Sequence, residues 1–168
     1  MPYTVINLGG VALGVGIIVM FLIRWWFKEK REWAALVPFV LAHLYGLLAA
    51  LAAFTSWSAL GIATWAAIWL ANVAGYAGLV WGVGGHAPLV TRGQPVVLTD
   101  GGFVIVFLLT LVFIALWKWA PRVPNAKLGA GIFSGICLAL SGSVAGAAAV
   151  PLGSAVNMLG SGFTGTFS

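Results

Sequence analysis

The chain has 168 residues, of which 62% are hydrophobic and 7% are charged, and its mean hydropathy is +1.09. A soluble domain carries charge on roughly a quarter of its residues, so eight Lys/Arg and three Asp/Glu cannot cover an aqueous surface. The basic residues lie at the ends of apolar runs, so the formal charge of +5 gives no direct evidence for nucleic acid as a partner. The composition predicts an all-α, polytopic transmembrane protein that forms one membrane domain over residues 1–168.

Four to five spanning helices are predicted, because a helix needs about 20 mainly apolar residues to cross a bilayer. The runs are apolar on every side and lack the alternation of a transmembrane β-barrel. In chain order they cover residues 5–23, 33–54, 59–83, 102–117 and 128–150, and a tail follows at 151–168. The fourth run is short and the fifth is less hydrophobic, which leaves the number open. The end of the tail has no charge, so we expect it to be flexible or packed against a partner.

Interfacial residues mark the ends of two runs. Residues 24–33 combine charges with three tryptophans, and residues 117–119 read Trp-Lys-Trp. Tryptophan and basic side chains are typical of the level at which a helix leaves the bilayer. Asp100, which two glycines follow, is the predicted N-cap of the fourth helix.

The distribution of Lys and Arg favours one orientation only weakly. With the N-terminus outside and five crossings, five Lys/Arg fall on the inner side and three on the outer side. The likeness of the two tryptophan-rich flanks indicates instead that both face one compartment, which requires an even number of crossings between them. A re-entrant or half-crossing segment between residues 59 and 100 would remove this conflict. We find no internal repeat at the period of a solenoid or a propeller.

Two stripes of small residues recur at every fourth position. Small residues with this spacing line one side of a helix and let backbones approach closely in lipid. One stripe lies in the third run and one in the fifth, and they consist of Ala59, Ala63, Ala67, Ala71 and Gly75, and of Gly131, Gly135, Ala139, Ser143 and Ala147. We predict that both are helix-packing surfaces, although small residues are common throughout this sequence. The spacing leaves open whether each stripe meets another helix of the chain or a second copy.

Two polar side chains lie at the predicted depth of the membrane interior. A tight turn after the second run would make an antiparallel hairpin with the third, which brings His43 near Asn72. An unpaired imidazole or amide is costly in hydrocarbon, so we predict a hydrogen bond between them. A polar pore lining and two separately satisfied side chains are the alternatives. His86 lies at a different depth from His43, which argues against a haem held by both.

The sequence lacks the residues that most enzymes and cofactor sites require. No carboxylate lies inside a predicted span, and no paired-acid, zinc-peptidase, nucleophile-elbow or phosphate-loop motif is present. Cys137 is the only cysteine, so neither an intrachain disulfide nor a cysteine metal cluster is available. We therefore expect no catalytic residue, no cofactor and no metal.

Three functional hypotheses remain. The first is a non-enzymatic building block that packs through its small-residue stripes into a homo-oligomer or with other membrane subunits. The second is a pore or channel of the holin type, and the third is a small transporter or accessory subunit. In size and hydrophobicity the chain also resembles the short membrane proteins that help conjugative elements spread between actinobacterial cells, a resemblance that rests on composition and on no motif. We expect a multi-pass protein of a bacterial or phage-encoded inner membrane.

Overall fold

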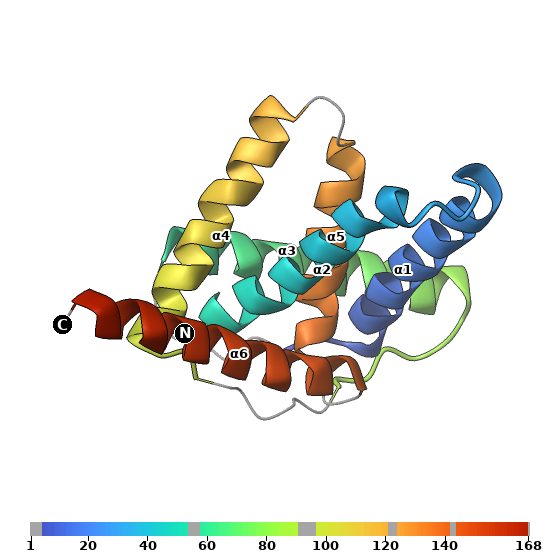
Figure 1. Cartoon of the computed structure of the whole chain (residues 1–168). Coiled ribbons are helices and arrows are strands. Elements are labelled where there is room, and N and C mark those ends of the chain that lie inside the picture. Colours follow the sequence, from blue (N-terminus) through green and yellow to red (C-terminus); the bar gives the residue numbers. More distant parts are fainter. Residues whose placement is uncertain (1–4, 54–57, 91–96, 121–123, 142–143, 168) are drawn as a thin grey trace.

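The computed structural model describes residues 5–53, 58–90, 97–120, 124–141 and 144–167 (Figure 1). This part of the chain is helical and contains no strand, only an isolated bridge between Asn7 and Leu89. The elements are α1 (Leu8–Lys28), α2 (Trp33–Ala53), α3 (Ala59–Tyr76), the π-helix η1 (Ala77–Gly82), α4 (Asp100–Trp119), α5 (Asn125–Ala139) and α6 (Val144–Phe167). Among the described helices α1, α2, α3 continued by η1, and α4 are long and apolar enough to cross a membrane. The predicted all-α class is confirmed.

Side-chain caps set where three helices begin. The Asn7 side chain accepts a hydrogen bond of 2.7 Å from the Gly10 amide, so α1 begins at Leu8. Thr99, and not Asp100 as predicted, caps α4 by accepting from the Gly102 amide at 3.2 Å. Asp100 instead occupies the first turn, where its negative charge faces the positive end of the helix dipole. Ser58 caps α3 in the same way as Asn7 caps α1.

The predicted fifth span at 128–150 is wrong, because two helices occupy this region. α5 ends at Ala139 and α6 begins at Val144. Residues 141–143 read Ser-Gly-Ser, and these residue types favour turns over helix interiors. With 15 residues, α5 is about 22 Å long, shorter than a hydrocarbon core of about 30 Å. The tail predicted at 151–168 is helical as far as Phe167.

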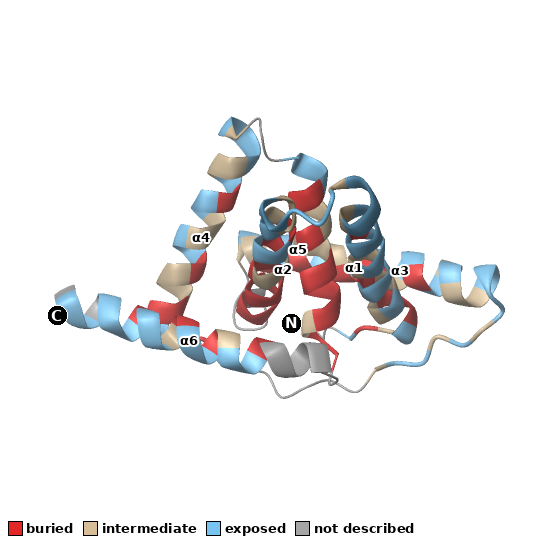
Figure 2. Ribbon diagram, turned by 45° about the vertical axis from the view of Figure 1, so that its right-hand side comes forward, coloured by how far each residue is buried: buried red, intermediate tan, exposed pale blue. Residues whose placement is uncertain are grey.

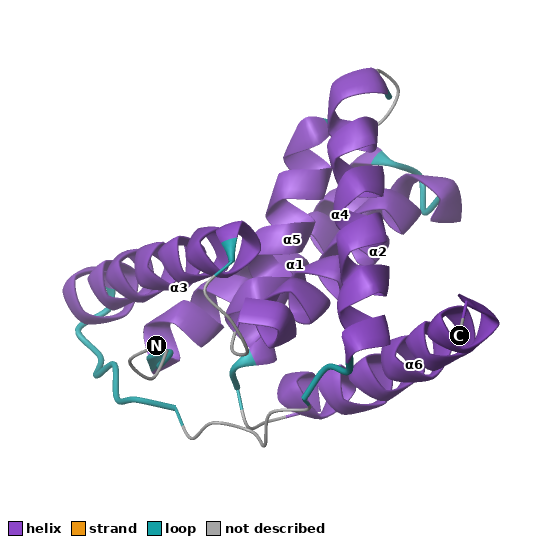
Figure 3. Cartoon of the chain, turned by 90° about the vertical axis from the view of Figure 1, so that its left-hand side faces the viewer, coloured by secondary structure: helices purple, strands orange, loops and turns teal. Residues whose placement is uncertain are grey.

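Four helices lie lengthwise and two lie across one of their ends. α1, α2, α4 and α5 run between the end where α1 and α4 finish and α2 and α5 begin, and an opposite end (Figure 1). α3 crosses the start of α1 and α6 crosses the start of α4, and the two lie on different sides of the molecule (Figure 3). The buried residues concentrate on α2 and α5 in the centre, whereas α1, α3, α4 and α6 bury only one face each (Figure 2).

The chain consists of two similar halves, α1 to α3 and α4 to α6. The buried positions of the first helix of each half have identical spacing: Gly9, Gly10, Gly14 and Phe21 in α1, and Gly101, Gly102, Val106 and Phe113 in α4. The same holds for the third helices, with Thr64, Ile68, Ala71 and Gly75 in α3, and Ala149, Gly153, Val156 and Gly160 in α6. Each half therefore uses one pattern of buried faces, a repeat of a longer period than those of solenoids and propellers.

Reciprocal contacts relate the two halves where α2 crosses α5. Gly46 lies against the carbonyl of Ile132, and Gly135 lies against the carbonyl of His43. Each glycine thus meets the carbonyl three residues before the other glycine. Contacts of this kind, in which each surface meets its own equivalent, are the signature of a two-fold axis. The repeat is therefore a pseudo-two-fold arrangement with α2 and α5 at its centre (Figure 1).

Within each half, the first and third helices cross at glycines. Gly9 lies against the backbone of Gly75 where α1 meets α3, and Gly101 lies against the backbone of Gly160 where α4 meets α6. A Cβ atom added to any of these four glycines would collide with the backbone of the other helix. Only glycine permits this approach, so both crossings depend on the absence of a side chain.

Replacement of Gly75 by alanine is expected to lower the free energy of unfolding by about 1–3 kcal/mol, because the added methyl group forces α1 and α3 apart. Gly78 is a matched control, since a Cβ there meets nothing within 4 Å. Gly78→Ala is expected to be neutral or stabilising by up to about 1 kcal/mol, because alanine favours the helix. Thermal unfolding in mild detergent measures both, and equal stability of the two variants would contradict the crossing.

Candidate functional site

The polar side chains at the helix crossings are the candidate site. His43 of α2 lies at the α2–α5 crossing, where its Nδ1 is 2.9 Å from the hydroxyl of Ser134 in α5. The Ser134 hydroxyl also donates to the carbonyl of Gly131 at 2.9 Å, and its side chain is fully buried. The second polar contact of α2 joins Tyr45 to Thr110 of α4, with 2.8 Å between their hydroxyl oxygens. The imidazole therefore lies at the interface between the two halves.

The structure does not bring His43 and Asn72 together as predicted. Asn72 instead holds the start of α1: its side-chain oxygen accepts from the Asn7 amide at 2.8 Å, and its side-chain nitrogen donates to the Val5 carbonyl at 2.7 Å. The Asn7 side chain returns a bond to the Asn72 carbonyl at 3.0 Å. The prediction assumed an antiparallel hairpin of α2 and α3, whereas α3 lies across the start of α1 and carries Asn72 to it.

Asn157 repeats this arrangement in the second half. Its side-chain oxygen accepts from the Thr99 amide at 2.9 Å, and its side-chain nitrogen donates to the Val97 carbonyl at 3.0 Å. The same asparagine-to-backbone bonds therefore fix the start of α1 and the start of α4. The sequence analysis missed Asn157, although a signal is present: Asn-x-x-Gly occurs at 72–75 and 157–160, and Val-x-x-x-Gly-Gly occurs at 5–10 and 97–102.

The predicted small-residue stripes are only partly packed within the chain. In the first stripe Ala71 and Gly75 are buried and Ala67 is partly buried, whereas Ala59 and Ala63 are exposed. The packed part faces α1 and α5.

The second stripe does not form one continuous surface. Gly131 and Gly135 are buried against α2, and Ala139 is partly buried at the end of α5. Ser143 lies outside the described residues. Ala147 belongs to α6, and its side chain lies outside the described part. The break between α5 and α6 separates the members of this stripe because a helical ridge cannot continue through a turn.

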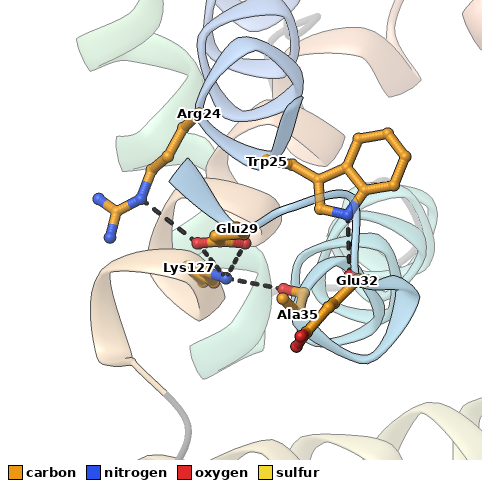
Figure 4. Close-up of polar contacts among 6 residues, drawn as sticks. All are labelled: Arg24, Trp25, Glu29, Glu32, Ala35 and Lys127. Carbon is orange, nitrogen blue, oxygen red and sulfur yellow. Dashed lines mark hydrogen bonds and ion pairs between the residues drawn. The ribbon is translucent and has the colours of Figure 1, made fainter. Parts of the chain in front are cut away.

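An ion pair joins the start of α5 to the connection between α1 and α2 (Figure 4). Lys127 Nζ lies 2.7 Å from both carboxylate oxygens of Glu29 and donates to the Ala35 carbonyl at 2.7 Å. Arg24 Nε lies 3.4 Å from the same carboxylate. Lys127 is only 6% exposed, so it forms part of the interior rather than a solvated surface.

This ion pair places the two tryptophan-rich flanks at one end of the molecule, which we call the charged end (residues 24–33, 117–120 and 124–127). The two flanks are neighbours in the fold, whereas the five-crossing topology put them on opposite sides of a membrane; the number of crossings stays a prediction. Along the chain, the first flank is followed by α2, α3 and α4 before the second flank begins. Of these three helices, α2 and α4 run lengthwise, whereas α3 lies across the bundle (Figures 1 and 3). Among the described residues, no three His, Cys, Asp or Glu side chains gather as a metal site would require.

Replacement of Asn72 by leucine is expected to destabilise the protein by about 1–3 kcal/mol, because the Asn7 amide and the Val5 carbonyl lose their partner. His43→Leu is expected to cost less, about 0.6 kcal/mol. The Ser134 hydroxyl keeps its bond to Gly131 when the imidazole is removed, so no buried donor is left unpaired. Unfolding of both variants in detergent tests this ranking, and a larger cost at His43 would reverse the roles we assign.

Replacement of Lys127 by methionine is expected to destabilise the charged end, because the Glu29 carboxylate and the Ala35 carbonyl lose their main donor. The cost should fall below the roughly 3–5 kcal/mol typical of a broken buried pair, since Arg24 still lies near Glu29. Lys118→Met is the control, because that lysine is exposed. Equal unfolding temperatures for the two variants would show that the pair contributes nothing.

No protein-family model, curated protein or solved structure matches this chain. Glycines and paired polar groups hold the two repeated halves together at the helix crossings. The described contacts of His43, Asn72 and Asn157 all join one helix to another helix or to a helix start. Their chemistry is that of structural hydrogen bonds, and the function is inferred from this arrangement.

Proposed function

We propose that the protein is a non-enzymatic, multi-pass membrane protein that packs with copies of itself or with other subunits into a membrane assembly. The observation that carries this proposal is the apolar outer surface. Large hydrophobic side chains are exposed on all four candidate spans, including Met20 in α1, Leu41 in α2, Trp69 in α3 and Ile114 in α4. In water such surfaces would cause aggregation, whereas a bilayer or a neighbouring subunit covers them.

The charge distribution supports one orientation in the membrane. All six Lys/Arg among the described residues lie in or beside the connections of the charged end. Short loops with excess Lys and Arg remain in the cytoplasm. We therefore place the charged end in the cytoplasm, with α1, α2 and α4 crossing the membrane and the starts of α1 and α4 at the outer side. The helix α5 lies lengthwise beside them but is too short to cross the hydrocarbon fully.

The use of the interior polar groups supports a structural role. His43 bonds to Ser134, Tyr45 bonds to Thr110, and Asn72 bonds to the start of α1. In lipid each bond of this type is worth on the order of 0.6–2 kcal/mol, and an unpaired group costs more. Groups that bond to one another contribute to helix packing, as a building block requires.

A small transporter is the second candidate, because repeated halves are common in transporters and their sites lie where the repeats meet. His43 and Ser134 occupy that position here. Expression in bacteria separates the two candidates: a building block leaves the membrane potential intact, whereas an open pore or an ion carrier lowers it. A collapse that His43→Leu prevents would replace the first proposal with the second.

Single-cysteine labelling tests the orientation, in a Cys137→Ser background because that buried cysteine is the only one. Cysteines that replace Lys30 and Lys118 are both expected to react with a membrane-impermeant maleimide only after the cells are opened. A cysteine that replaces His86, on the connection after η1, is expected to react in intact cells. Labelling of positions 30 and 118 from opposite sides of the membrane would contradict the shared charged end. Loss of the protein from membranes in alkaline carbonate would contradict membrane insertion itself.

The assembly is tested by its mass in mild detergent. A building block is expected to run as a uniform oligomer or in a complex with other subunits. The exposed members of the first stripe, Ala59 and Ala63, offer a contact surface for a second chain. A monodisperse monomer that pulls down no partner from solubilised membranes would contradict this part of the proposal.

A further inference from the structure

An apolar groove of about 520 Å³ runs between α2, α4 and α6. Its lining side chains are aliphatic or aromatic, and the one polar side-chain atom among these residues, the Tyr45 hydroxyl, is already bonded to Thr110. The groove follows α2 and α4, which are both candidate membrane spans, and α6 bounds it through Leu152 and Leu159. If these helices cross a membrane as proposed above, the groove lies at the depth of the hydrocarbon.

The groove exists because the two halves differ at this place. In the pseudo-two-fold arrangement, the contact of α4 with α2 corresponds to the contact of α1 with α5. The latter contact is close at Gly14, where an added Cβ would lie 2.8 Å from Cys137 Cβ.

Residue size explains the difference. α5 carries Ala130 and Ser134 at the positions where α2 carries Leu41 and Tyr45, counted from the equivalent glycines Gly135 and Gly46. Small residues let α1 approach α5, whereas the bulky pair holds α4 away from α2.

A charged hollow adjoins the end of the groove that α6 does not cover. Pro38 lines both the groove and this hollow, which contains Lys28, Lys30 and Lys127 together with Glu29 and Glu32. Lys127 is paired with Glu29, whereas Lys28 and Lys30 are exposed. The described part of the charged end carries six Lys/Arg against Glu29 and Glu32, so its net charge is positive. An anionic group is therefore favoured at this mouth of the groove.

We propose that the groove binds one acyl chain of an anionic phospholipid, whose headgroup lies at the charged end. This inference rests on the proposed membrane insertion. A polar occupant would lose its hydrogen bonds in a wholly apolar lining, so the groove selects a hydrocarbon chain. The basic mouth selects an anionic headgroup over a zwitterionic one, because each nearby Lys or Arg adds about 1 kcal/mol of attraction.

The experiment measures phospholipid that stays with the full-length protein. The protein is reconstituted in vesicles of equal parts phosphatidylglycerol and phosphatidylcholine, purified in mild detergent, and its bound lipid is quantified by mass spectrometry. Val112→Trp fills the groove from α4 and is expected to lower the retained lipid about tenfold, which corresponds to about 1.4 kcal/mol of binding free energy. Val112 is 50% exposed, so the larger side chain points into space rather than into the core.

The repeat supplies a matched control. Met20 occupies in α1 the position that Val112 occupies in α4, is 59% exposed and does not line the groove. Met20→Trp is expected to retain lipid as the wild type does. Leu159→Trp, which fills the groove from α6, is the second test variant, and thermal unfolding verifies that each variant is folded.

Charge is tested separately from the groove. Lys28→Gln combined with Lys30→Gln is expected to lower the ratio of bound phosphatidylglycerol to phosphatidylcholine about tenfold. An unchanged ratio would overturn the anionic headgroup.

Equal lipid retention by wild type, Val112→Trp and Met20→Trp would overturn the groove as the site. A smaller oligomer with Val112→Trp and unchanged lipid would assign the groove to a second copy of the chain instead. Extraction of the wild-type protein by alkaline carbonate would contradict the proposed membrane insertion. A protein that stays in the membrane but shows none of these differences in bound lipid would contradict only the lipid site.

Discussion

Direct contact between helix backbones at glycines is the constraint on which the rest of the structure depends. Gly9 meets Gly75, Gly101 meets Gly160, and Gly46 and Gly135 each meet a carbonyl of the opposite helix. A side chain at any of these positions would separate the helices and remove the contacts that lie around them. In lipid, where apolar burial does not drive helices together, such close approach supplies dispersion and positions the few polar bonds. The asparagine contacts at the starts of α1 and α4 are possible because the glycines bring the helices within reach.

The same arrangement of these contacts occurs in both halves of the chain. Each half has two lengthwise helices followed by a third helix that crosses the start of the first, and the halves meet where α2 crosses α5. The first two helices of each half are joined at the charged end, where Lys127 pairs with Glu29. The repeat also explains where the halves differ: small residues close the α1–α5 contact, and bulky ones leave an apolar groove between α2 and α4. The groove is thus a place where the two halves differ, and the inferred lipid site is located there.

Hydropathy and helix propensity act locally, so they predicted much of the fold from the sequence. The ranges of α2 and of α3 with η1 agree with the predicted runs to within a residue, since capping and apolar composition decide them. The fifth run failed, because Ser-Gly-Ser at 141–143 outweighs a uniformly apolar composition. For the candidate site, the sequence placed His43 and Asn72 in helices and identified Gly75, Gly131 and Gly135 as packing residues. It paired His43 with Asn72, because it assumed that α2 and α3 form an antiparallel hairpin. In the structure α3 instead crosses the start of α1, so Asn72 bonds to that start and His43 bonds to Ser134.

By itself, the sequence determined that the chain is helical, that its composition is far more apolar than that of an ordinary soluble domain, and that its charges gather beside two tryptophan-rich segments. Those properties depend on composition and on neighbours along the chain. Only the tertiary structure decided that the two segments share one end, that Asn157 is the counterpart of Asn72, and that α3 lies across the bundle. These features depend on contacts between residues far apart in the sequence, and the shape that allows them arises only when glycine faces from different helices meet.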